Sequence, residues 1–148
     1  MITNVLIQLF ERDFDHLTRE ISDFRDEKNL WLTPNDVNNS AGNLCIHLCG
    51  NLQHFIGAQL GNTGYVRNRP YEFGAKHIHR TELLKEVTKA KQIVIDTLKN
   101  ISSEQLTEEF PIQVWGEAIT NEFFLTHLHG HFTYHLGQIS YQRRILDR

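Results

Sequence analysis

The chain has 148 residues, of which 40% are hydrophobic and 22% charged, and it carries a formal net charge of −3. A domain of this length buries a hydrophobic core without disulfides or a structural metal, so a metal ion in it would serve chemistry. Because basic residues cluster only at Arg143 and Arg144, the composition argues against nucleic-acid binding and against a polybasic membrane surface. No run resembles a signal peptide or approaches the roughly 18 apolar residues of a membrane span. We therefore expect one cytoplasmic domain over residues 1–148.

The first predicted helix covers residues 2–24, where apolar side chains recur at three- and four-residue spacing. Residues 29–39 contain a proline and several Asn and Asp residues, which predicts a connection. Ser40 can cap a second helix over residues 40–60. Gly61 follows that helix, in the position where a left-handed residue commonly ends a helix.

Residues 61–78 contain three glycines, one proline and two neighbouring arginines, with little hydrophobic periodicity. This composition predicts a long loop, and long loops in compact domains are more often functional than idle. A third helix is predicted from Thr81 to about Asn100, because its apolar and charged side chains fall on opposite sides.

Residues 108–119 alternate partly between polar and apolar side chains. This pattern predicts an extended excursion from the bundle, which can take the form of a short hairpin. Thr120 can cap a fourth helix that runs to about Leu146. Arg143 and Arg144 near its end suit the negative pole of the helix dipole. Four helices without a convincing sheet predict an all-α four-helix bundle.

Histidines occupy a polar stripe on both the second and the fourth predicted helix. His127, His131 and His135 follow one another at four-residue spacing, and the second helix carries His47 and His54. Histidines four residues apart project from one side of a helix about 6 Å apart along its axis, close enough to reach one ion. A third histidine from the second helix would complete three nitrogen ligands and leave a position open for water, as catalytic metal sites do.

Spacing alone leaves several choices open. On the fourth helix, His131 can pair with either His127 or His135. On the second helix, His47 and His54 share a face but stand about 10 Å apart along the axis, so they are not expected to bind the same ion. The chain has nine histidines, so a pair at this spacing also arises by chance, as ordinary polar contacts of a bundle.

Cys45 and Cys49 lie on the second helix, each about 200° around it from His47. We predict that both are buried thiols that point away from the metal. His129 lies on another side of the fourth helix, where we expect it to be exposed. The chain lacks a glycine-rich phosphate loop, a nucleophile elbow and an H-E-x-x-H motif.

Two segments resemble signature segments of a known superfamily. Residues 40–57 read SAGNLCIHLCGNLQHFIG, and residues 131–144 read HFTYHLGQISYQRR. Both resemble the DinB-like superfamily, and the similarity follows the helix order of the whole chain. Residues 61–73, which read GNTGYVRNRPYEF, further resemble a DinB-like subgroup whose members mostly carry an unknown-function label.

The resemblance selects the metal ligands. The superfamily's helix-two histidine falls on His47, and its H-x-x-x-H-x-G-Q run falls on His131, His135, Gly137 and Gln138. It implies a bundle, often dimeric, in which His47, His131 and His135 bind one divalent ion beside an open cavity. Zinc or nickel is the expected metal, and iron, manganese or copper is the alternative. Some relatives are thiol transferases or isomerases that use a low-molecular-weight thiol such as bacillithiol or mycothiol.

Other polar side chains are candidates for the surroundings of the metal. Asn51 lies one turn beyond His47, and Gln138 lies one turn beyond His135, so each can hydrogen-bond near a ligand. His54 shares the His47 stripe and is a candidate general base or substrate contact. Each of the three also has a plain interpretation as a polar contact of the bundle.

The long loop adds further candidates. Arg67 and Arg69 can bind a carboxylate or phosphate through planar bidentate contacts. Tyr65, like Tyr134 on the fourth helix, can orient a water or a substrate. In the plain interpretation, the arginines are solvated and the tyrosines are packing residues.

Three hypotheses for the function remain. In the first, which we favour, a divalent ion activates a thiol or water that attacks a small molecule, in thiol transfer or hydrolysis. In the second, the protein is a non-catalytic metal- or ligand-binding stress protein, which the lack of an acid/base carboxylate near the histidines supports. In the third, the histidines are ordinary contacts of a structural homodimer. No nucleic-acid or membrane partner is expected under any of them.

Overall fold

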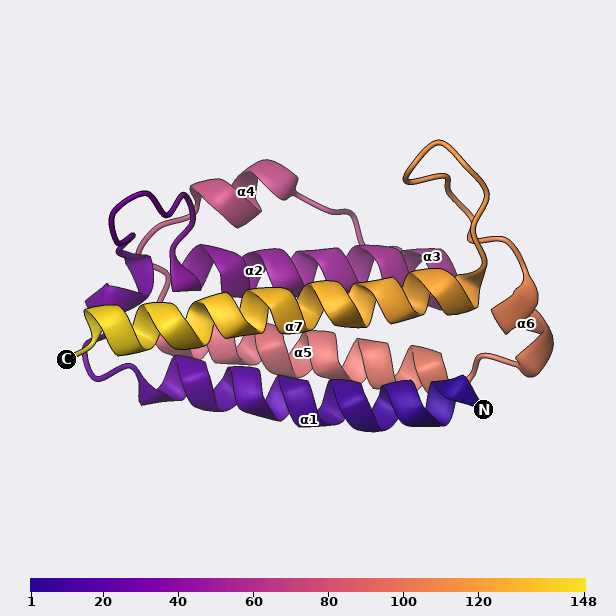
Figure 1. Cartoon of the computed structure of the whole chain (residues 1–148), viewed down its shortest axis with the longest axis horizontal. Coiled ribbons are helices and arrows are strands. Elements are labelled where there is room, and N and C mark those ends of the chain that lie inside the picture. Colours follow the sequence, from indigo (N-terminus) through magenta and orange to yellow (C-terminus); the bar gives the residue numbers. More distant parts are fainter.

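The computed structural model describes residues 1–148 and is built on four long helices. These are α1 (Ile2–Asp23), α2 (Ala41–Leu52), α5 (Arg80–Lys99) and α7 (Asn121–Leu146). They lie side by side along the long axis of the molecule (Figure 1), and α1 and α2 each pack against both α5 and α7. The predicted all-α bundle is therefore confirmed.

The second predicted helix has the expected extent but is not regular. Ser40 caps α2 by accepting a hydrogen bond from the Asn43 backbone N–H. After α2, one π-helical segment, η2 (Gln53–Ala58), and one short turn, α3 (Gln59–Gly61), continue the same rod. The left-handed residue at its end is Asn62, with φ of 51°, so the expectation for Gly61 is wrong.

Gly61 is needed for a different reason, the close approach of α5. A Cβ atom at Gly61 would lie 2.5 Å from Oγ1 of Thr97, which is closer than any side chain tolerates. The glycine therefore lets the end of the rod lie against α5.

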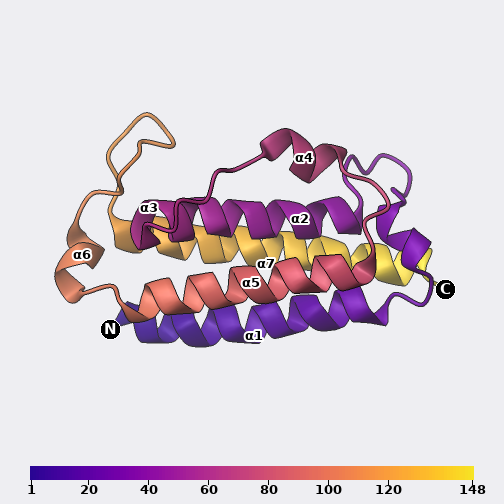
Figure 2. The same cartoon turned by 180° about the vertical axis from the view of Figure 1, so that it is seen from behind.

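Helices α2 and α5 run in the same direction, as both views show (Figures 1 and 2). A connection between parallel helices must return along the whole length of the first one, and here the crossover (residues 62–79) does so over α2. The predicted loop is wrong in one respect, because the crossover contains α4 (Arg69–Gly74). Asn68 caps this helix and Pro70 occupies its first turn, where a missing N–H costs nothing.

Two short elements complete the connections. The 3₁₀ helix η1 (Glu27–Trp31) precedes α2, and α6 (Ser103–Thr107), which the sequence pattern did not predict, precedes the excursion. The excursion itself (residues 108–119) is a bent loop that forms no strand, rather than the predicted run of extended backbone. The hairpin reduces to a single antiparallel bridge between Glu109 and Thr120.

One cluster of 31 buried hydrophobic residues fills the bundle. Aromatic rings join α1 to α7, with Phe14 and Phe132 centroids 4.9 Å apart. None of the helices combines the length and the apolar character needed to cross a membrane.

Two partly buried polar contacts also hold α1 against α7. Asp13 lies 2.7 Å from His129, and Glu20 lies 2.6 Å from Arg143. The expectation that His129 is exposed is wrong, since its side chain is 13% exposed and its ring packs on Phe10. Helical spacing places His129 away from the three ligands, but it does not show that this side of α7 faces α1.

We expect Glu20→Gln to lower the free energy of unfolding by about 1–3 kcal/mol at pH 7, the range for a buried hydrogen bond to a charged group. Burial raises the pKa of Glu20, but hydrogen bonds from Arg143 and Ser140 outweigh it and hold that pKa below its usual value. The pair therefore stabilises the fold above the ordinary Glu pKa of about 4.3, and this is lost as the pH falls through the lower folded pKa.

Denaturant unfolding at pH 7 and at pH 3 measures this difference. Glu82→Gln is the control, because the Glu82–Lys85 pair is exposed and such pairs contribute at most about 1 kcal/mol. An equal loss for Glu20→Gln at both pH values would contradict the ion-pair explanation.

Candidate metal centre

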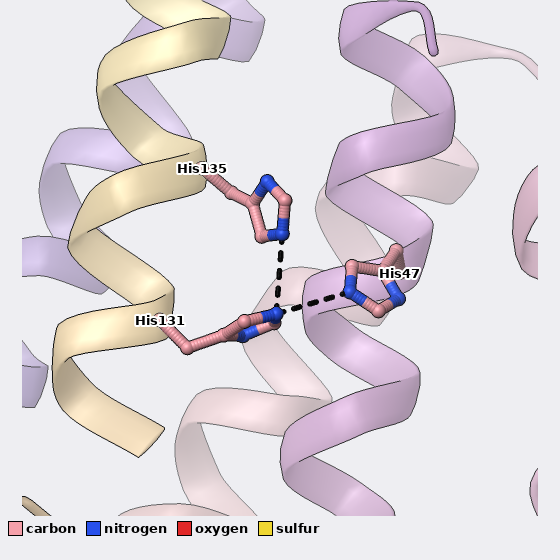
Figure 3. Close-up of side chains that lie close together, drawn as sticks. All are labelled: His47, His131 and His135. Atoms are coloured by element: carbon pink, nitrogen blue, oxygen red, sulfur yellow. Dashed lines mark hydrogen bonds between the residues drawn. The ribbon is translucent and has the colours of Figure 1, made fainter. Parts of the chain in front are cut away.

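Three histidines from two helices meet between α2 and α7 (Figure 3). The Nε2 atom of His131 lies 3.3 Å from Nε2 of His47 and 3.1 Å from Nε2 of His135. All three ligand atoms lie within 4.8 Å of one another. Tetrahedral zinc with Zn–N bonds of about 2.0–2.1 Å separates its ligand nitrogens by about 3.3 Å. The two shorter separations therefore match those that a tetrahedral metal ion would require.

Two of these imidazoles have a fixed tautomer. Nδ1 of His47 lies 2.9 Å from Oε1 of Glu72, and Nδ1 of His135 lies 2.7 Å from Oε1 of Gln138. A carboxylate and an amide oxygen only accept hydrogen bonds, so each Nδ1 carries the proton and donates it. Each Nε2 then presents a lone pair to the centre of the site, as metal-bound histidines do.

Without a cation, this arrangement is electrostatically unfavourable. The three Nε2 atoms hold at most one proton, on His131, which can satisfy only one of the two neighbouring lone pairs. If His131 instead carries its proton on Nδ1, that proton is buried without a hydrogen-bond partner. A cation between the three Nε2 atoms would accept all three lone pairs, so the donor set fits a divalent transition-metal ion.

Two of the three histidines are kept neutral by their surroundings. Burial, with smaller contributions from His135 and His47, lowers the pKa of His131 to about 3. Burial also lowers the pKa of His135. Neutral imidazole is the form that binds metals, so these ligands are available at neutral pH.

Glu72 is a residue of the candidate site that the sequence did not indicate, because no carboxylate was expected near the histidines. It lies on α4, is 2% exposed, and binds Arg67 through two hydrogen bonds, from Nε to Oε2 (2.8 Å) and from Nη2 to Oε1 (2.9 Å). Burial raises the pKa of Glu72, but the hydrogen bonds from His47 and Arg67 outweigh it, so the carboxyl is ionised. Oε1 thus accepts from both His47 and Arg67, which explains why Nη2 of Arg67 is 3.3 Å from Nδ1 of His47.

A glycine makes room for Glu72. A Cβ atom at Gly50 would lie 2.2 Å from Oε2 of Glu72, so any side chain there would displace the carboxylate. Asn43 holds α4 over this point by donating from Nδ2 to the carbonyl oxygens of Glu72 and Ala75. A glycine one turn after His47, with an acid in the arginine-bearing crossover, was the available sequence signal.

The other predicted residues on α2 and η2 lie around the site without joining it. Asn51 is 6% exposed, and its Oδ1 has no hydrogen-bond partner. His54 is partly exposed and packs against Phe55, and burial and the charge of Arg67 lower its pKa. His127, the alternative ligand on α7, packs against Trp115 and is not part of the three-histidine cluster.

The other two crossover candidates lie in different surroundings, Tyr65 at a cavity and Arg69 on an aromatic ring. Tyr65 faces a cavity of about 330 Å³ between α2, the crossover and α5. Arg69 is exposed and stacks on Phe73, which in turn packs on His47. Tyr134 is 65% exposed beside His135.

The cysteines are buried free thiols, as predicted. A hydrogen bond with Cys45 and burial raise the pKa of Cys49 well above its usual value. A thiol in that state is a poor nucleophile.

Comparisons with known proteins define a family but no activity. A profile of the family described as "Protein of unknown function (DUF1572)" matches residues 3–148. No curated protein matches the chain. The crystal structure of a conserved protein from Enterococcus faecalis is similar, with a TM-score of 0.76 and 18% identity over 99% of this chain and 97% of that one. At this identity, the similarity shows the fold alone.

In metal-free protein, we expect the His131 ring to stay neutral when the pH is lowered from 8 to 5. Its pKa of about 3 lies far below the value of about 6.5 for an ordinary histidine. NMR titration of ring nitrogens measures this directly, and the same spectra should show His47 and His135 in the Nδ1–H form. A midpoint near 6.5 for His131 would contradict the burial that the structure gives it.

Proposed function

We propose a metal-dependent function for this chain, which belongs to the DUF1572 family of proteins of unknown function. In this proposal, His47, His131 and His135 bind one divalent transition-metal ion. The observation that carries it is the convergence of three Nε2 atoms, two of them held as lone-pair donors by Glu72 and Gln138. Zinc or nickel is the metal we favour, with iron, manganese or copper as alternatives.

We also propose that the chain is a member of the DinB-like superfamily. The two signature-like segments supply α2 and α7, which lie next to each other in a four-helix bundle. The histidines that the signatures select are the ones that meet, whereas His54 and His127 stay outside the cluster.

The chemistry we propose is thiol transfer or hydrolysis on a small molecule. A divalent ion at three neutral ligands lowers the pKa of a coordinated thiol or water, so that an anionic nucleophile exists at neutral pH. The protein's own part is orientation: Glu72 holds the ring of His47, Gln138 holds that of His135, and Arg67 keeps Glu72 ionised.

A second candidate function is metal or ligand binding without turnover, as in a stress-response protein. The observation that favours it is that Glu72, the carboxylate beside the ligands, already binds His47 and Arg67 and is no free general base. A screen of the metal-loaded protein for conjugation of several low-molecular-weight thiols to electrophiles separates the two. Turnover supports the enzyme, and its absence with every thiol supports binding alone.

Protein purified without a histidine tag should contain about one equivalent of metal, and His131→Ala should contain none. Three neutral nitrogen ligands bind tightly, whereas two leave an incomplete site. Elemental analysis after dialysis measures the content. His127→Ala is the matched control, one turn earlier on α7, and should keep the metal. A metal-free wild type would refute the proposal.

Gly50→Ala should weaken metal binding by about 10- to 100-fold although it changes no ligand, because its Cβ displaces the carboxylate that orients His47. Competition with a chromophoric chelator measures the affinity, and circular dichroism checks the fold. Gly130→Ala is the control, since a Cβ there meets nothing within 4 Å. Wild-type affinity in Gly50→Ala would show that Glu72 does not support the site.

A further inference from the structure

The charge of the site is not balanced once it holds a divalent ion. The three ligands are neutral imidazoles, and Glu72 is already neutralised by its two hydrogen bonds from Arg67. His47 and Glu72 are both buried, so solvent screens this region poorly. An uncompensated positive charge in such surroundings favours an anionic ligand.

Arg67 has one unused donor group. Its Nε and Nη2 bind Glu72, whereas Nη1 has no hydrogen-bond partner in the protein. The side chain is 12% exposed, and its guanidinium carbon lies 5.8 Å from the centre of the Phe55 ring. A guanidinium held on one side by Glu72 keeps the opposite side fixed in place for a second anion.

His54 contacts the same aromatic ring. Its own ring centroid lies 4.7 Å from that of Phe55, so His54 and Arg67 both border this side chain. Neither ring nitrogen of His54 has a hydrogen-bond partner in the protein, and the side chain is partly exposed. Nη2 of Arg67 also lies 3.3 Å from Nδ1 of His47, so the guanidinium borders both a proposed metal ligand and the Phe55 ring that His54 contacts.

We propose that the ligand of this site carries a carboxylate, which binds Nη1 of Arg67 and the imidazole of His54 beside the metal ion. Two donors match the two oxygens of one carboxylate. The ligand class is then a small molecule with a metal-binding group, such as a thiol, and a carboxylate. This inference rests on the proposed metal site and adds what that site recognises.

Two thiol probes that differ in one group test it, 3-mercaptopropionate and its neutral amide. Each is titrated into Co²⁺-loaded protein, and the thiolate-to-cobalt absorption band reports binding. The measured quantity is the ratio of the two dissociation constants, amide over acid. We expect the wild type to prefer the acid by about tenfold, the lower end for hydrogen bonds to a charged group.

Arg67→Lys retains a cation that can pair with Glu72 but removes Nη1, and His54→Gln removes the imidazole. Each variant should bring the ratio at least threefold closer to one. The two thiols differ in acidity, and this difference contributes equally to the ratio in every variant. The change in the ratio from wild type to variant is therefore the quantity that tests the inference. Arg69→Gln is the matched control, an exposed arginine two residues away that stacks on Phe73, and should leave the ratio unchanged.

Each outcome decides the inference. A ratio near one in the wild type, or the wild-type ratio in both Arg67→Lys and His54→Gln, overturns it while the metal site stands. Loaded protein that binds neither probe overturns it as well. Cobalt content is measured on the same samples, and protein that takes up no cobalt refutes the metal site itself, and the inference with it.

Discussion

The buried carboxylate of Glu72 joins three parts of the molecule at one point. It accepts hydrogen bonds from His47 on α2 and from Arg67 in the crossover, while its own helix α4 is held to α2 by Asn43. A buried carboxylate is costly unless its oxygens are paired, so the loss of either partner would leave Glu72 unfavourably buried. Gly50 permits this arrangement because it has no side chain in the space that the carboxylate occupies. The orientation of His47, and through it the geometry of the three-histidine cluster, depends on this one interaction.

The topology explains why the carboxylate comes from a distant segment. Because α2 and α5 are parallel, the crossover has to pass back over α2, with α4 above that helix (Figure 2). This path brings Arg67 and Glu72 to His47. The rest of the bundle is an ordinary support, with a continuous apolar core and the pairs Asp13–His129 and Glu20–Arg143 between α1 and α7. Because α2 and α7 pack against each other, helix packing sets the distance between His47 on α2 and His131 on α7.

Electrostatics gives this site its chemical character. Burial keeps His131 and His135 neutral, hydrogen bonds on Nδ1 aim the Nε2 lone pairs of His47 and His135 inward, and the nearby carboxylate is neutralised by an arginine. Such a centre supplies donors for a cation but no net negative charge to balance it. The proposed metal binding and the proposed attraction of an anion are therefore two consequences of one arrangement.

The sequence by itself determined the four long helices, the caps at Ser40 and Thr120, and the helical stripes that carry the histidines, because periodicity and capping are local properties. It left two ligand pairs open, which the resemblance to a superfamily reduced to His47, His131 and His135. Only the tertiary structure decided that His129 faces α1, that the crossover contains α4, and that Glu72 lies against His47. The reason is physical: these contacts join residues 25 to 116 positions apart, and no local pattern records which distant side chain a helix face will meet.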